Sequence, residues 1–73
     1  MIWKMTDHSV SEKHTFLKLP EVQQITGLSR SGIYQKVQDG IFPPPIKIGE
    51  RATAWIEKEV RQWMQDIIDD NRG

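Results

Sequence analysis

The short run from Gly27 to Ser29 constrains the fold most, because it can end one helix and start another. Glycine adopts the left-handed conformation that closes a helix at low cost. The Ser29 hydroxyl can accept hydrogen bonds from the free N–H groups of a following first turn. A three-residue connection between two helices is typical of a helix-turn-helix, so we expect a helix on each side of it.

The segment before this turn is predicted to be a helix with an apolar inner face. Pro20 fits the first helical position, where a missing N–H costs nothing, and Glu21 favours the positive end of the helix. Val22 and Ile25 are three residues apart and therefore face the core. We expect the helix to end in a Schellman motif that places Leu28 against this apolar face.

The segment after the turn, from about Arg30 to Gln38, is predicted to be the second helix. Ile33 and Val37 are four residues apart and should face the first helix. The outward positions carry no acidic group and can donate to phosphates and base edges, so we interpret this as a DNA recognition helix. Glycine inside a helix is unfavourable, and Gly32 has two open explanations: tolerance in the first turn, or close approach of the backbone to a phosphate.

A small β-hairpin, or wing, is predicted after the second helix. Three prolines at 43–45 force an extended path, with Phe42 as a core residue beneath it. Residues 46–48 alternate as a strand, residues 49–51 form a turn, and residues 52–55 pair back. Lys47 and Arg51 are then two basic groups on the wing. They can reach phosphates or an adjacent minor groove, or simply be solvated charges.

The last helix is predicted from about Glu57 to Asp69, with a wide apolar stripe from Val60 to Ile68. Acidic residues near its C-terminus oppose the helix dipole, so we expect fraying beyond Ile68. The far end of the stripe is a candidate surface for self-association or a partner. The predicted organisation is a flexible tail over residues 1–15, one domain over 16–69 and a frayed C-terminus over 70–73.

Composition argues against several functional classes. The 73 residues include no cysteine, and the only histidines are His8 and His14 in the tail, so we expect no metal site, cofactor or catalytic residue. No apolar run approaches the ~20 residues that a membrane span needs, and we expect a cytoplasmic protein. The formal net charge is zero, but the centre is mildly basic and the last helix is acidic. A nonspecific nucleic-acid binder is therefore disfavoured.

The chain resembles the AlpA family of short prophage and genomic-island regulators. Six separated blocks carry the resemblance, in order: Leu19–Val22, Thr26–Tyr34, Gly40–Pro43, Lys47–Ala52, Trp55 and Glu59–Trp63. It spans roughly residues 16–68 and implies a mainly α winged helix-turn-helix of the MerR and excisionase type. It also implies transcriptional control of integrase genes, or direct action as an excisionase (a recombination directionality factor). Gly32 and Gln35 depart from the threonine and arginine usual in similar sequences.

Double-stranded DNA is the expected partner, with an integrase and further copies of the chain as additional candidates. The resemblance implies DNA contacts from Ser29, Arg30, Ser31 and Tyr34, at the cap and in the recognition helix, and from Arg51 in the wing. The polar or basic character of three further side chains adds Gln35, Lys36 and Lys47. The full predicted set is Ser29, Arg30, Ser31, Tyr34, Gln35, Lys36, Lys47 and Arg51. The alternative hypothesis is a protein-binding adaptor or inhibitor that uses the same fold without DNA.

Overall fold

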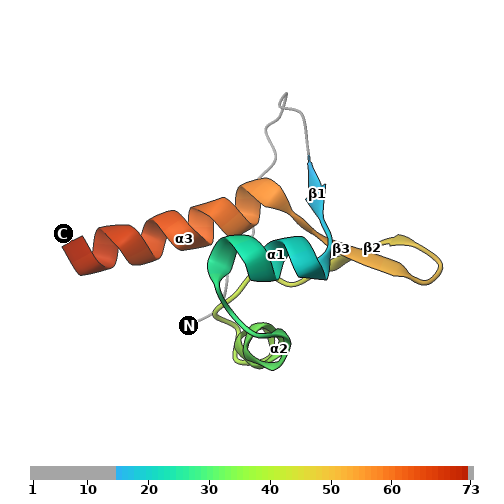
Figure 1. The fold of residues 1–73 in the computed structure, drawn as a ribbon, viewed down its shortest axis with the longest axis horizontal. Helices are drawn as coiled ribbons and strands as arrows, with labels where there is room; N and C mark the ends of the chain where they lie inside the picture. The colour runs from blue at the N-terminus through green and yellow to red at the C-terminus, as the bar shows by residue number, and fades with distance from the viewer. Residues whose placement is uncertain (1–14, 73) are drawn as a thin grey trace.

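The computed structural model describes residues 15–72, so Trp3, both histidines and most of the predicted tail lie outside the described residues. The described chain contains three helices and three strands (Figure 1). In order they are β1 (Phe16–Leu17), α1 (Leu19–Thr26), α2 (Arg30–Gln38), β2 (Ile46–Gly49), β3 (Ala52–Ile56) and α3 (Glu57–Arg72). This arrangement confirms the predicted winged helix-turn-helix.

The wing belongs to a three-stranded antiparallel sheet in the order β1-β3-β2. The predicted hairpin of β2 and β3 is present, with Lys47 opposite Thr53 and an irregularity in register between Lys47 and Gly49. The sequence analysis missed β1, which pairs Phe16 with Ile56 and Leu17 with Trp55. A two-residue strand has no periodicity of its own, because its existence depends on the distant strand that it pairs with.

One apolar core lies where the helices and the sheet meet. Its buried side chains come from all three helices, from β1 and β3, and from the segment before β2. Phe42 is 1% exposed, as expected of a core residue beneath the proline run, and its ring meets Trp63 edge-on with centroids 4.7 Å apart. The buried cluster consists of Leu17, Val22, Ile33, Phe42, Trp55 and Val60. This core holds α2 against α1 and also supports the base of the wing.

The turn after α1 differs from the predicted Schellman motif. Gly27 has the expected left-handed backbone, with φ 77°, and its N–H donates to the Gln23 carbonyl at 2.8 Å. The Leu28 N–H donates to the Thr26 hydroxyl at 3.2 Å, where a Schellman motif would use a backbone carbonyl. The Thr26 side chain therefore takes over a bond that the backbone was expected to make. Leu28 nevertheless packs against the core.

The Schellman pattern occurs instead at the end of α2. The Ile41 N–H donates to the Lys36 carbonyl at 3.0 Å, and the Gly40 N–H donates to the Val37 carbonyl at 3.1 Å. Gly40 has φ 78°, the left-handed conformation that this motif requires. The motif ends α2 sharply and turns the chain into the proline segment that leads to the wing.

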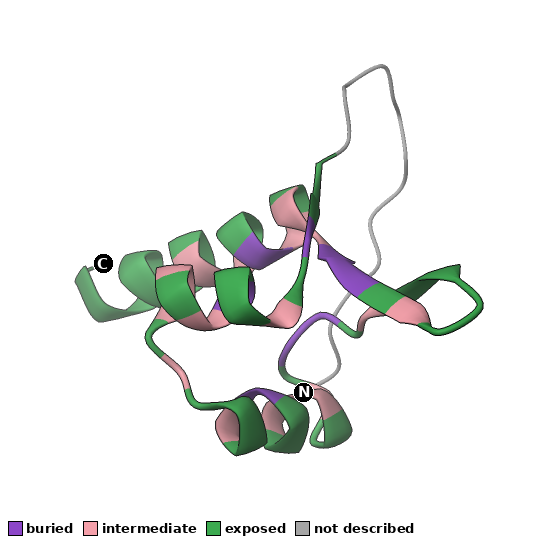
Figure 2. Cartoon of the chain, turned by 45° about the vertical axis from the view of Figure 1, so that its right-hand side comes forward, coloured by how far each residue is buried: buried purple, intermediate pink, exposed green. Residues whose placement is uncertain are grey.

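Helix α3 is longer than predicted. It runs to Arg72, whereas we expected an end near Asp69 and a frayed terminus after it. Exposed side chains support its last turns: Gln65 donates to Asp69 at 3.0 Å, and Asn71 donates to the Ile67 carbonyl at 2.9 Å. Figure 2 shows that this distal part is exposed all round. Within residues 15–72, no helix combines the length and the apolar character needed to cross a bilayer.

Candidate nucleic-acid interface

The start of α2 is held by the predicted cap. The Ser29 hydroxyl accepts a hydrogen bond from the Gly32 N–H at 3.0 Å, and the Ser29 carbonyl accepts from Ile33 at 2.9 Å. A Cβ atom added to Gly32 would lie 3.0 Å from the Ser29 Oγ, which is tighter than ordinary van der Waals contact. The absence of a side chain at position 32 therefore leaves room for the Ser29 cap, which explains structurally why a glycine suits the first turn of α2.

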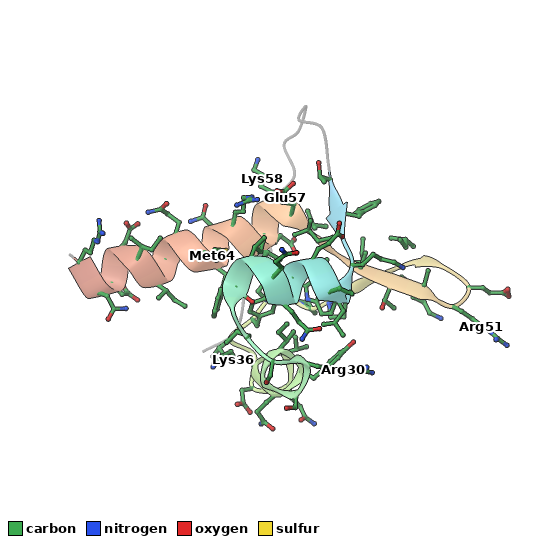
Figure 3. All side chains as sticks on the ribbon, in the orientation of Figure 1. Arg30, Lys36, Arg51, Glu57, Lys58 and Met64 are labelled. Carbon is green, nitrogen blue, oxygen red and sulfur yellow. The ribbon has the colours of Figure 1, made fainter. Side chains whose placement is uncertain are left out.

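Helix α2 presents three different surfaces around its axis. Ile33 is fully buried and defines the side that faces the core. With 3.6 residues per turn, Ser31 and Gln35 lie on the opposite, outer side, and both are exposed. Arg30 and Lys36 lie on the two flanks between these sides, and Figure 3 shows them extending from opposite sides of the helix. The helix thus has a neutral polar outer surface with one cation on each flank.

The flank that carries Arg30 is connected to the wing through two aromatic rings. The Arg30 guanidinium lies 5.9 Å from the centroid of the Tyr34 ring, a cation–π geometry. The Tyr34 ring in turn lies 6.0 Å from the ring of Trp55, which belongs to β3. Tyr34 is 40% exposed, so its ring is only partly covered. The Tyr34 ring, which contacts Trp55 of the wing, therefore limits the directions in which the Arg30 side chain can extend.

Trp55 also connects the proline segment to the wing, which the sequence analysis did not foresee. Its indole N–H donates to the Pro43 carbonyl at 2.8 Å, and the bond is buried. Pro43 and Trp55 are both almost completely buried. One side chain thus contacts α2, the segment that leaves α2, and the strand that forms the wing. No local pattern could have indicated a bond between residues 12 positions apart.

The wing carries its two basic residues toward the side of α2. Alternate residues of a strand share a face, so Thr53 lies on the same face as Trp55, and Lys47 lies opposite Thr53 on that face. Lys47 is exposed because it lies beyond the edge of the core. Arg51 is exposed in the turn, and Figure 3 shows it at the tip of the wing, on the same side of α2 as Arg30.

An acidic group lies beside the outer surface of α2, whose outward positions were predicted to carry none. The Gln35 amide donates to the Asp39 carboxylate at 3.2 Å, so an acidic group lies beside the polar side chains at the C-terminal end of the helix. This bond also engages the Gln35 side chain, which we had counted as available to DNA. The spacing of four residues on a helix was the signal that could have indicated it.

The predicted residues are therefore grouped on two elements rather than on one surface. Ser29, Ser31 and Gln35 belong to the cap and outer side of α2, and Arg30 and Tyr34 to its wing-side flank. Lys47 and Arg51 lie on the wing beyond that flank, and Lys36, which is half-buried, lies on the far flank.

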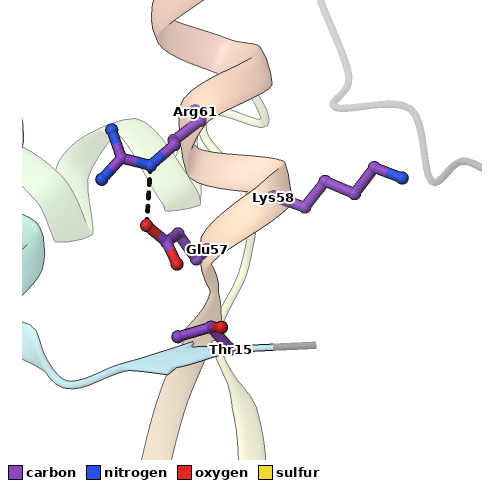
Figure 4. A pocket seen from close by; sticks show the side chains of 4 residues that line it. All are labelled: Thr15, Glu57, Lys58 and Arg61. Atoms are coloured by element: carbon purple, nitrogen blue, oxygen red, sulfur yellow. Dashed lines mark hydrogen bonds and ion pairs between the residues drawn. The ribbon is translucent and has the colours of Figure 1, made fainter. Parts of the chain in front are cut away.

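A shallow hollow of about 310 Å³ lies elsewhere, where β1 begins and α3 starts. Its charged lining is used structurally: Arg61 donates to the Glu57 carboxylate at 2.7 Å, and the Glu57 N–H donates to the Thr15 carbonyl at 2.8 Å (Figure 4). Two residues after Glu57, burial raises the pKa of the Glu59 carboxyl above its usual value of 4.5. This region joins α3 to the sheet and forms no part of the basic flank.

The sequence was compared with known proteins. The sequence model of the family described as "Prophage CP4-57 regulatory protein (AlpA)" matches residues 15–68. The uncharacterized protein ORF88 of Enterobacteria phage P4 is 47% identical over 53 residues, which cover 73% of this chain and 60% of that protein. The DNA-binding transcriptional activator AlpA of Escherichia coli (strain K12) is 35% identical over 54 residues, which cover 66% of this chain and 77% of that protein. No solved structure matches.

The fold defines a winged helix-turn-helix protein, and the family match covers all of its described elements except the last turn of α3. The chain belongs to the AlpA family of prophage regulatory proteins. It spans 60% of the length of the phage P4 relative. The resemblance noted from the sequence blocks is confirmed.

Proposed function

We propose that this protein is a non-enzymatic, sequence-specific DNA-binding regulator of prophage or genomic-island genes. The observation that carries this proposal is the arrangement of Arg30, Lys47 and Arg51 on α2 and the adjoining wing. It is supported by membership of the AlpA family, since the related Escherichia coli protein is described as a DNA-binding transcriptional activator.

In this proposal α2 enters the major groove with its outer surface toward the bases. Ser31 faces base edges, and Gln35 does so through the amide hydrogen and oxygen that its bond to Asp39 does not use. Lys36, on the far flank, faces the phosphates that border the groove. Arg30 has the reach to contact a guanine bidentately, and its contact with Tyr34 limits the directions that it can take. Ser29 and the free N–H groups of the first turn are placed to meet a phosphate. The wing reaches the neighbouring backbone or minor groove through Lys47 and Arg51.

Affinity from one copy should be modest. Four cations on these elements can neutralise about four phosphates, so the logarithm of the binding constant should fall with the logarithm of salt with a slope of about −3 to −4. Asp39 lies beside the reading surface and repels a phosphate backbone, which reduces binding to unrelated DNA.

The test is binding to duplex fragments that flank the protein's own gene and the nearest integrase gene, followed by footprinting. Arg30→Ala should weaken specific binding about 10-fold to 100-fold. Arg72→Ala removes the same charge from the exposed end of α3 and is the matched control. Arg30→Lys keeps the charge but not the bidentate geometry, so it should lose specificity more than nonspecific affinity.

No protection of any fragment, or equal effects of the two alanine variants, would reject DNA binding through this surface. Activity that survives both Arg30→Ala and Arg51→Ala would instead support a protein-binding adaptor. A role as an excisionase needs a separate experiment, namely excision in vitro with the cognate integrase, because regulation and excision require the same binding surface. The cytoplasm is the compartment in which this proposed activity would operate.

A further inference from the structure

Apolar side chains are exposed around the margin of the sheet face opposite Leu17 and Trp55, whereas Ala54 at the centre of that face is 0% exposed. Because paired residues share a face, Phe16, Ile46 and Ile56 lie on the side of Ala54, whereas Leu17 and Trp55 point into the core. Phe16 is 48% exposed and Ile46 is 36% exposed; Ile48, next along β2, is 42% exposed. We call Phe16, Ile46 and Ile56 the outer sheet face; Ile48 lies within the register irregularity between Lys47 and Gly49 and is not counted in it. A small domain has few apolar side chains, and here several of the largest lie outside the core.

A second apolar surface lies at the far end of α3. Ile67 is 41% exposed and Ile68 is 44% exposed, past the last core residue of the helix. Three carboxylates surround this pair, at Asp66, Asp69 and Asp70, and we call the five residues the distal α3 patch. The carboxylates of Asp66 and Asp69 are held by Gln62 and Gln65, at 2.8 Å and 3.0 Å.

The outer sheet face extends from the base of the wing along β2, away from the distal α3 patch, and the two surfaces differ in the charges near them. Figure 1 shows the wing and the C-terminal end of α3 at the two ends of the longest axis, whose extent is 40 Å. Lys18 follows β1 and Arg51 lies in the turn between β2 and β3, with Glu50 beside it, and all three are exposed, whereas the distal α3 patch is acidic. Surfaces this far apart cannot meet within one molecule, but each can meet its complement on a neighbouring copy.

The position of α2 relates these two ends to DNA. In Figure 1 the helix is seen end-on, so its axis is roughly perpendicular to the line from the wing to the end of α3. A helix in the major groove lies along the groove, so the long axis of the protein then crosses the grooves and follows the duplex. The molecule is 40 Å long, and one turn of duplex is about 34–36 Å. Copies on successive turns would therefore bring the end of one α3 to the wing of the next.

We propose that the distal α3 patch of one copy docks on the outer sheet face of the next copy. The contact is head-to-tail and does not close into a ring on straight DNA, so it extends a row of copies with about one helical turn between neighbours. The spacing rests on the proposed function, whereas the contact itself does not. Both surfaces are small, so the contact is weak in free solution and strengthened where DNA holds neighbours together.

The chain contains no cysteine, so an introduced thiol is unique and reports its own neighbours. Ile68→Cys labels the distal α3 patch and Ile46→Cys labels the outer sheet face. The two full-length proteins are mixed under a mild oxidant, with and without a long duplex, and disulfide-linked heterodimers are compared with each homodimer. Gln24→Cys, exposed on α1, replaces either partner as the control for random collision.

We expect the mixture of Ile68→Cys and Ile46→Cys to give at least several-fold more crosslinked dimer than any pair that includes Gln24→Cys. Asp69→Lys in the Ile68→Cys protein should reduce that yield, and circular dichroism would verify that each variant is folded. Heterodimer formed without DNA supports the contact even if DNA binding fails its own test; formation only on DNA supports the contact and the row together.

Three outcomes would overturn the proposal. Heterodimer no more abundant than the control, with and without DNA, would show that the two patches do not meet. An excess of the Ile68→Cys homodimer would indicate symmetric pairing of α3 with α3. A fast intramolecular disulfide in a Trp3→Cys/Ile46→Cys protein, in place of the heterodimer, would assign the outer sheet face to the chain's own N-terminal segment.

Discussion

The wing side of α2 and the distal half of α3 are held in place by contacts of different range. Trp55 joins α2, the proline segment and β3 through a ring contact and a buried hydrogen bond. The distal half of α3 is supported by hydrogen bonds between residues four apart, all of them exposed. The surface proposed to read DNA therefore has its geometry set by the core, whereas the surface proposed to contact a neighbour depends on local helix formation.

The largest expected effect comes from removing the long-range contact. Trp55→Ala should lower the free energy of unfolding by about 3–5 kcal/mol, because it leaves a cavity and an unpaired Pro43 carbonyl. Ile68→Ala in the exposed part of α3 should change it by less than about 0.5 kcal/mol. Urea denaturation followed by circular dichroism measures both, and losses of similar size would contradict the distinction between the two regions.

A smaller effect is expected at the cap of α2. Ser29→Ala should cost about 1 kcal/mol, since the Gly32 N–H loses its side-chain acceptor. Ser31→Ala is the control, because it removes a hydroxyl at an exposed position two residues along and should change stability by less than about 0.5 kcal/mol. Thermal unfolding without DNA separates this effect from any loss of binding. Equal costs would mean that the cap does not stabilise the helix.

Because a Cβ at position 32 would crowd the Ser29 hydroxyl, substitutions at these two positions should have non-additive effects on the free energy of unfolding. Gly32→Ala raises helix propensity by up to about 1 kcal/mol, but its Cβ meets the Ser29 hydroxyl at 3.0 Å. We therefore expect a smaller gain in the wild-type background than in the Ser29→Ala background. A double-mutant cycle on urea denaturation gives the difference. Additive effects would show that the hydroxyl moves aside freely, and that glycine is merely tolerated at this position.

The smallest effect concerns Glu59 at the start of α3. Burial raises its pKa in the folded state, so the folded protein binds this proton more tightly than the unfolded chain does. The free energy of unfolding should therefore fall as pH rises from the ordinary value of 4.5 through the raised pKa. Glu59→Gln should remove that fall and gain a few tenths of a kcal/mol at neutral pH, because partial exposure screens the charge. Identical pH profiles for the two proteins would contradict this assignment.

Local features of the fold were predictable because their causes are local. The bounds of α2 follow from Ser29 at its start and Gly40 at its end, and the inward direction of Ile33 follows from periodicity alone. The same reasoning placed Arg30 and Ser31 at exposed positions of α2. Whether these residues contact DNA stays a prediction.

The features that sequence reasoning missed depend on residues that are distant in the chain. Strand β1 forms only because β3 offers it a partner, 40 residues along at Phe16 and Ile56. Trp55 was expected on the returning strand of the wing, but its bond to Pro43 depends on where the proline segment passes. The end of α3 was predicted too early in the chain for another reason. The prediction took account of the unfavourable charges near the helix terminus but not of the hydrogen bonds that Gln65 and Asn71 donate.

Gly27 shows what the turn between the two helices requires. Its φ is 77°, yet a Cβ added there would meet nothing within 4 Å. The position therefore requires a residue that tolerates a positive φ, whereas the size of the side chain is not restricted by its neighbours. Asparagine, which tolerates this conformation, should be accepted, whereas a β-branched residue should fail despite the open space. The turn itself therefore depends on one backbone dihedral at Gly27, while the core sets how α2 lies against α1.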